Sequence, residues 1–184
     1  MEVKETDIQG LKIIKPKIFE DSRGYFFESY NKKDLKKFLG DIEFVQDNQS
    51  LSEYGTIRGL HYQLAPYSQA KLVRVIQGKI YDVAVDIREN SPTYGQYFGI
   101  ELSEQNKTQL FIPKGFAHGF SVLSSQAIVL YKTDGFYHKD SERGINYNDP
   151  ELGIDWQIKP SASILSSKDK VLPPWKEAEK NFHF

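Results

Sequence analysis

The sequence predicts a mainly β protein, a jelly-roll β-barrel with a few short helices. Aromatic residues make up 14% of the chain, with 11 Tyr and 12 Phe, and such residues pack well on pleated strands. Short apolar runs separated by turn residues fill its middle, which is typical of β-sandwiches and barrels. Because 184 residues suit one domain, we expect a single domain over residues 1–184, with an N-terminal strand segment and a short C-terminal helical tail.

The first predicted helix covers residues 31–40. Asn31 is a favoured N-cap, Leu35, Phe38 and Leu39 recur at helical spacing, and Gly40 is a favoured terminator. A second and weaker helical pattern covers residues 175–180, directly after the only double proline of the chain.

Strands are predicted between these two helices. Residues 71–87 contain two β-rich runs that break at Gln77-Gly78, which indicates a hairpin. Further strand-like runs cover residues 98–102, 109–113 and 119–131, the last with a break at Ser124-Ser125. No repeat, low-complexity tract or long linker divides the chain, which agrees with one domain.

Charge and cysteine content argue against several functional classes. Lys and Arg total 24 against 25 Asp and Glu, a net charge of −1, so we expect neither nucleic-acid nor membrane-surface binding. The chain has no cysteine, which excludes disulfides, thiolate metal ligands and cysteine nucleophiles. Residues 1–14 are rich in charge and no window reaches 18 apolar residues. We therefore predict no signal peptide, no membrane span and a cytoplasmic location.

Histidine is the obvious candidate for acid–base catalysis near neutral pH. His61 lies in the polar segment of residues 55–63. A lone histidine is more often a hydrogen-bonded structural residue, so both interpretations stay open for His61.

His118 lies in a Pro-x-Gly-x-x-His motif, Pro113 to His118. This motif resembles the second motif of the cupin superfamily. Metal-binding cupins add a His-x-His and a Glu in their first motif, whereas this chain offers only His61-x-Gln63. We therefore expect no metal site, because a zinc or iron site needs three or four convergent ligands. A buried structural role for His118 is equally open.

Five further side chains are candidates for a role in catalysis or binding, and each also has an ordinary structural explanation. Tyr131 ends a predicted strand and is either packing or a general acid. Lys71 opens an apolar strand and is either a surface residue or a cation that faces the interior. Arg23 and Arg58 each precede a glycine, a pattern suited to phosphate but common in surface turns. Asp169 reads from spacing alone as a turn or cap residue.

The ordered motifs of the chain together closely resemble the dTDP-4-dehydrorhamnose 3,5-epimerases. These motifs are Asp21-x-Arg23-Gly24-x-Phe26-x-Glu28, Gln46-x-Asn48-x-Ser50, Arg58-Gly-Leu-His61-x-Gln63, Gln69-x-Lys71, Asp82-Val-Ala-Val-Asp86-x-Arg88, Ser91-Pro-Thr-x-Gly95, Ile112-Pro-x-Gly-Phe-Ala-His118, Tyr131-Lys132, Asn148-Asp149-Pro150 and Ser167-Lys168-Asp169. The resemblance implies a cofactor-free homodimer that epimerises dTDP-4-dehydro-6-deoxy-D-glucose at carbons 3 and 5.

The resemblance also implies roles for individual residues. His61 is the implied base, Asp169 its supporting carboxylate, Tyr131 the acid on the opposite face of the sugar, and Lys71 the cation that stabilises the enolate. The implied substrate-binding residues are Arg23, Phe26, Glu28, Gln46, Asn48, Arg58, Gln63, His118 and Tyr137. Family members place Arg23, Phe26 and Glu28 at the thymidine end, across a dimer interface.

Three alternatives remain beside the double epimerase. The first is an epimerase of a single position, or a ketoisomerase, that acts on a related dTDP-4-keto sugar. The second is a non-catalytic cupin that binds a nucleotide sugar. The third is a metal-dependent cupin oxygenase, which the incomplete ligand set disfavours.

Overall fold

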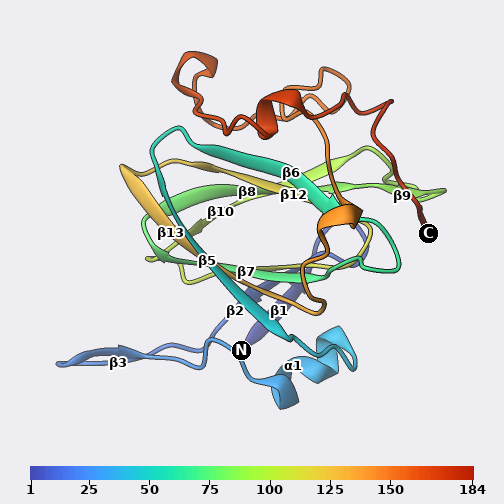
Figure 1. Cartoon of the computed structure of the whole chain (residues 1–184). Coiled ribbons are helices and arrows are strands. Elements are labelled where there is room, and N and C mark those ends of the chain that lie inside the picture. Colours follow the sequence, from blue (N-terminus) through green and yellow to red (C-terminus); the bar gives the residue numbers. More distant parts are fainter.

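Fifteen strands, one α-helix and three 3-10 helices make up the computed structural model, which describes residues 1–184 (Figure 1). Most strands belong to two antiparallel sheets. The larger sheet has the strand order β1-β2-β11-β7-β13-β5. Its strands are β1 (Glu2–Glu5), β2 (Lys12–Lys15), β11 (Gln109–Ile112), β7 (Lys71–Gln77), β13 (Gln126–Thr133) and β5 (Gln46–Glu53).

The smaller sheet has the strand order β10-β8-β12-β6-β14. Its strands are β10 (Tyr97–Ser103), β8 (Lys79–Asp86), β12 (Phe116–Val122), β6 (Ile57–Gln63) and β14 (Glu142–Gly144). The two strands predicted over residues 71–87 form and break at Gly78, but the predicted hairpin is wrong. β7 pairs with β11 and β13 whereas β8 pairs with β10 and β12, so the turn at Gly78 carries the chain from one sheet to the other. Gly78 has a φ of +78°, and a Cβ there would lie 2.1 Å from the carbonyl oxygen of Gln126, so glycine is required.

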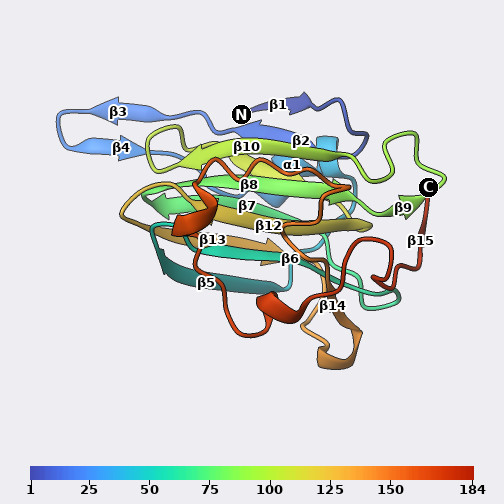
Figure 2. The same cartoon turned by 90° about the horizontal axis from the view of Figure 1, so that it is seen from above.

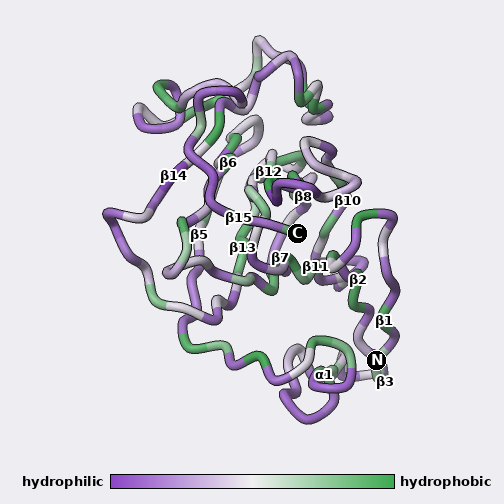
Figure 3. Tube along the Cα trace, turned by 90° about the vertical axis from the view of Figure 1, so that its right-hand side faces the viewer, coloured by the Kyte–Doolittle hydropathy of each residue, from purple (hydrophilic) through white to green (hydrophobic).

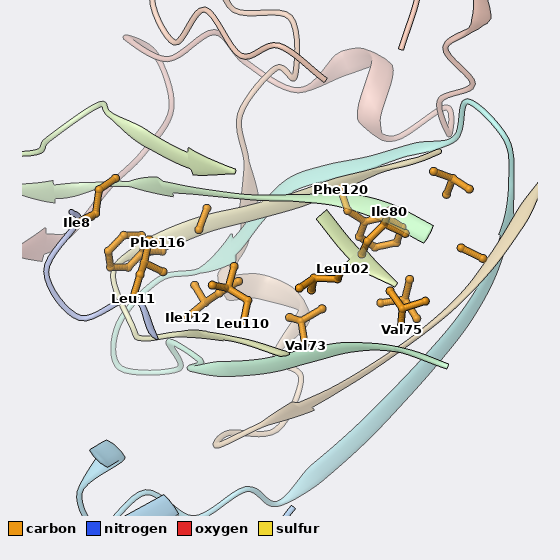
Figure 4. Packing of buried hydrophobic residues seen from close by; sticks show 14 residues of the cluster. Ile8, Leu11, Val73, Val75, Ile80, Leu102, Leu110, Ile112, Phe116 and Phe120 are labelled. Atoms are coloured by element: carbon orange, nitrogen blue, oxygen red, sulfur yellow. The ribbon is translucent and has the colours of Figure 1, made fainter. Parts of the chain in front are cut away.

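The two sheets face each other and enclose the main hydrophobic core (Figure 4). Val73 and Val75 from β7 pack with Ile80 and Leu102 from the opposite sheet. The apolar stretches of β7 and β13 lie at the centre of the molecule (Figure 3). The mainly β, jelly-roll prediction is therefore confirmed, although the sheets do not close into one hydrogen-bonded barrel. β5 pairs only with β13, and β6 pairs with β12 and the short β14 but not with β5, which leaves this edge open.

The C-terminal segment covers the outer face of the smaller sheet (Figure 1). Leu152, Trp156, Trp175 and Phe182 are buried there against Val83 and other outward residues of the sheet. The central strands β8 and β12 are thus buried on both faces of this sheet. The short elements of this half are β9 (Arg88–Glu89), β15 (Phe182–His183) and the 3-10 helices η1 (Lys139–Ser141), η2 (Pro160–Ala162) and η3 (Asp169–Val171).

The two helix predictions have different outcomes. Helix α1 (Lys32–Leu39) forms as expected: the Asn31 side chain accepts from the Asp34 amide, and Gly40 follows the last turn. Leu35 is buried against the outer face of the larger sheet. The predicted helix over residues 175–180 is wrong, because this segment forms only turns. Trp175 and Ala178 are buried on the smaller sheet, so packing rather than helix periodicity fixes the backbone here.

A separate hairpin, β3 (Phe19–Asp21) and β4 (Gly24–Phe26), projects beyond both sheets (Figure 2). All six of its strand residues are exposed, including the aromatic rings of Phe19, Tyr25 and Phe26. No helix of the structure is long and apolar enough to cross a membrane.

Candidate active site

A cavity of about 830 Å³ lies between the two sheets, beside the open edge. β6 and β12 supply one wall and β5, β7 and β13 supply the other, while the segment before η3 covers one side. Ten of the thirteen predicted site residues line this cavity. They are Gln46, Asn48, Arg58, His61, Gln63, Lys71, His118, Tyr131, Tyr137 and Asp169.

His61 and Asp169 form a histidine–carboxylate pair in this cavity. Nε2 of His61 lies 2.5 Å from Oδ1 of Asp169, and the Ser166 hydroxyl donates to Oδ2 at 2.8 Å. The His61 side chain is 31% exposed, whereas that of Asp169 is only 5% exposed. Burial alone would raise the pKa of Asp169, but the His61 hydrogen bond and charge, with Ser166 and Lys168, lower it below its ordinary value. Asp169 is therefore a stable anion that can support a protonated His61.

Tyr131 and Lys71 face the cavity from the larger sheet, opposite His61. Lys71 Nζ lies 6.0 Å from the centre of the Tyr131 ring and donates to the His61 carbonyl at 3.5 Å. Burial raises the pKa of Tyr131 above its ordinary value. Burial also lowers the pKa of Lys71 to about 8, although Asp82 and Glu142 partly oppose this shift. The cavity thus holds a histidine paired with a carboxylate on one wall, and a phenol with an ammonium group on the other.

Three of the polar candidates come from β5 and the start of β6. Gln46 and Asn48 are on the same face of β5, and Nε2 of Gln46 donates to the side-chain oxygen Oδ1 of Asn48 at 2.9 Å. Arg58 Nε donates to the Ser52 hydroxyl at 2.9 Å. This bond orients the guanidinium group at the cavity wall.

Gln63 contacts backbone rather than open space. Its amide donates to the carbonyls of Tyr67 at 2.6 Å and Phe136 at 3.3 Å, and its oxygen accepts from the His138 amide at 2.7 Å. Gln63 is only 4% exposed. These bonds hold the segment that carries Tyr137, whose ring is 56% exposed at the cavity.

His118 lies directly opposite His61 in the register of β12 and β6. Its Nε2 is 2.7 Å from Oδ1 of Asp82, a carboxylate with no exposed surface. Burial lowers the pKa of His118, and Asp82 only partly offsets this effect. His118 is therefore both buried, as in its structural interpretation, and part of the cavity wall.

Arg23, Phe26 and Glu28 do not reach the cavity of their own chain. Arg23 and Phe26 belong to the projecting hairpin, where Arg23 pairs with Asp21 at 2.6 Å and Phe26 is 66% exposed (Figure 2). Glu28 follows this hairpin and accepts a hydrogen bond from Asn31 at 3.2 Å. Their predicted binding roles stay predictions.

Several polar residues that line the cavity were not predicted from the sequence. Glu142 and Lys168 form an ion pair at 2.5 Å, and the Tyr137 hydroxyl donates to the same Glu142 oxygen at 2.7 Å. Lys168 stands in the final quoted motif, but no sequence signal separates Glu142 from a surface residue. No group of three or more His, Asp or Glu side chains converges as a metal site would require.

The sequence also matches a known protein family over most of its length. A family model described as dTDP-4-dehydrorhamnose 3,5-epimerase matches residues 5–177. The chain belongs to this epimerase family. A dTDP-4-dehydrorhamnose 3,5-epimerase of Shigella flexneri is 52% identical over 92% of this chain and 93% of that protein.

Solved structures of the epimerase family match the whole fold. One is a dTDP-6-deoxy-D-glucose-3,5-epimerase from Legionella pneumophila, crystallised with dTDP-4-keto-L-rhamnose. Its TM-score is 0.92 at 49% identity, covering 96% of this chain and 93% of that one. A 3′-monoepimerase from Streptomyces bikiniensis, crystallised with dTDP-quinovose, has a TM-score of 0.86 at 30% identity and covers 92% of this chain and 85% of that one.

Proposed function

We propose that this epimerase inverts carbons 3 and 5 of dTDP-4-dehydro-6-deoxy-D-glucose and releases dTDP-4-dehydro-L-rhamnose. Both carbons flank the carbon-4 ketone, so removal of either proton gives an enolate that the ketone oxygen stabilises. Inversion requires proton removal from one face and return to the other. The observation that carries the proposal is the placement of His61 and Tyr131 on opposite walls of one cavity.

His61 removes the proton as the general base. The nearby Asp169 carboxylate holds the ring in one orientation and stabilises the imidazolium that forms. The Ser166 hydroxyl also donates to Asp169, which fixes the carboxylate beside His61.

Tyr131 returns a proton from the opposite wall as the general acid. Its raised pKa favours the protonated phenol that this step needs. Lys71 lies between Tyr131 and the His61 strand, and its ammonium group stabilises the negative charge that develops on the ketone oxygen.

The remaining cavity residues bind the nucleotide sugar. Arg58 contacts the diphosphate, Gln46 and Asn48 bind beside it, and the exposed ring of Tyr137 offers a stacking face for the base. His118 lies next to the sugar.

We also propose that the chain acts as a homodimer, in which the projecting hairpin serves the partner's cavity. Arg23 and Phe26 lie on an exposed hairpin that does not reach its own cavity. Leu51 and Ile76 add exposed apolar surface on the larger sheet. A partner would cover this surface and use the hairpin for thymidine binding. The cytoplasmic location remains a prediction from sequence.

Epimerisation at a single carbon is the second candidate. The Streptomyces bikiniensis monoepimerase shares the fold at 30% identity, so the fold alone does not separate one inversion from two.

The His61→Ala variant tests catalysis separately from binding. We expect a loss of turnover of at least about 10²-fold, because the general base is gone. Affinity for dTDP should stay nearly unchanged in calorimetry. Full turnover by this variant would reject His61 as the base, and absence of dTDP binding by the wild type would reject the nucleotide-sugar assignment.

A further inference from the structure

One ion pair joins two distant segments on the solvent side of the cavity. Nζ of Lys168 lies 2.5 Å from Oε2 of Glu142, with side-chain exposures of 57% and 19%. Glu142 begins β14, whereas Lys168 immediately precedes η3. The Tyr137 hydroxyl donates to the same Glu142 oxygen at 2.7 Å. Glu142 therefore contacts both the flexible side chain of Lys168 and the hydroxyl group of Tyr137 at the cavity rim.

Glu142 is one of only two carboxylates among the residues that line the cavity. The other is Asp169, which is already bound to His61 and Ser166. Burial would raise the pKa of Glu142, but its hydrogen bonds with Lys168 and Tyr137 and the charges of Lys168 and His61 hold the pKa below its ordinary value. Glu142 is thus an anion in a cavity that must receive a diphosphate.

The lysine in this pair is also a candidate partner of that diphosphate. Lys168 lines the cavity together with Arg58 and Lys71. Arg58 already donates to Ser52 at 2.9 Å, and Lys71 lies near Tyr131. Of these three cations, only Lys168 forms an ion pair with a carboxylate, that of Glu142.

We propose that Glu142 competes with the ligand's diphosphate for Lys168 and thereby limits nucleotide affinity. The inference rests on the proposed dTDP-sugar substrate. Binding exchanges the Glu142–Lys168 pair for a diphosphate–Lys168 pair, so the net gain is smaller than for a free lysine. On product release Glu142 takes Lys168 back, which shortens the residence time of the bound nucleotide.

Titration calorimetry of the full-length protein with dTDP tests this competition. Glu142→Gln is nearly isosteric and its amide oxygen still accepts from Tyr137. We expect it to bind dTDP about threefold to tenfold more tightly, as removal of one partly exposed competing charge allows. Lys168→Met should weaken binding, and Glu142→Gln should give no further gain in the Lys168→Met background.

A matched control removes the same charge away from the cavity. Glu151 pairs with Lys176 at 2.9 Å outside the lining residues, so Glu151→Gln should leave dTDP affinity unchanged. Unchanged or weaker binding by Glu142→Gln would overturn the proposal. A gain that persists with Lys168→Met would also overturn it, since simple repulsion would then suffice. Failure of the wild type to bind dTDP would instead reject the proposed function.

Discussion

His61 and Asp169 lie 108 positions apart, yet a 2.5 Å contact joins their side chains. Spacing alone gave no reason to connect them, because Asp169 stands in a short turn-like segment. The family resemblance supplied the pair, and the fold brings the two side chains together. Glu142 illustrates the limit of sequence reasoning, since its contacts with Lys168 and Tyr137 depend on three segments that meet only in the folded chain.

The alkaline pH limit of the reaction depends on Lys71. Its pKa is lowered to about 8, so its stabilising charge is present below this pH and lost above it. The raised pKa of Tyr131 keeps the phenol protonated over the same range. We therefore expect kcat/KM, which reports the free enzyme, to fall as pH rises through about 8.

The Lys71→Arg variant checks this assignment. A guanidinium group stays charged throughout this range, so the alkaline limb should move to higher pH even if the maximal rate is lower. A limb that stays near pH 8 in the variant would contradict the role of Lys71.

At the scale of elements, the cavity strands β5 and β6 were the hardest to predict. β5 reads Gln-Asp-Asn-Gln-Ser-Leu-Ser-Glu, with polar residues on both faces. One face lines a polar cavity and the other is exposed, so no apolar alternation signals the strand. β7 and β8 were predictable as strands from their apolar runs and the break at Gly78. Their pairing as a hairpin was wrongly predicted, because the turn at Gly78 connects the two sheets and a local pattern does not show which strands pair. The wrongly predicted helix at residues 175–180 shows tertiary packing overriding a short periodic pattern.

The segment that carries Tyr137 depends on Gln63. Gln63→Met removes three hydrogen bonds to the backbone of Tyr67, Phe136 and His138, and each unsatisfied buried group costs about 1–3 kcal/mol. We expect weaker dTDP binding and faster hydrogen exchange over residues 134–138, with a smaller change in kcat. Gln105→Met, on a surface turn, is the control. A fall in kcat with unchanged dTDP affinity would argue that Gln63 acts on the reaction itself.

At the scale of the whole molecule, the expected jelly roll forms but remains an open sandwich. The cavity lies beside the edge where β5 and β6 do not pair with each other. A closed barrel was expected because strand count and turn spacing do not reveal which strands pair. The projecting hairpin is likewise unexplained by one chain alone, since its aromatic rings cover no part of its own core.

Complementation between two inactive variants tests whether the hairpin serves the partner. Co-expressed chains with Arg23→Ala and with His61→Ala should form mixed dimers in which one cavity is intact. With random pairing of the chains, about a quarter of wild-type activity should return. If the hairpin served its own cavity, mixing would restore nothing, and this outcome would contradict the proposed exchange.

Proton exchange at the sugar tests the proposed reaction most directly. Incubation of dTDP-4-dehydro-6-deoxy-D-glucose with the protein in deuterated water can be followed by proton NMR. Removal and return of protons by His61 and Tyr131 predicts loss of signal at both carbon 3 and carbon 5. Loss at only one carbon would indicate a single-position epimerase. No exchange, with dTDP still bound, would contradict catalysis and leave a nucleotide-sugar-binding protein.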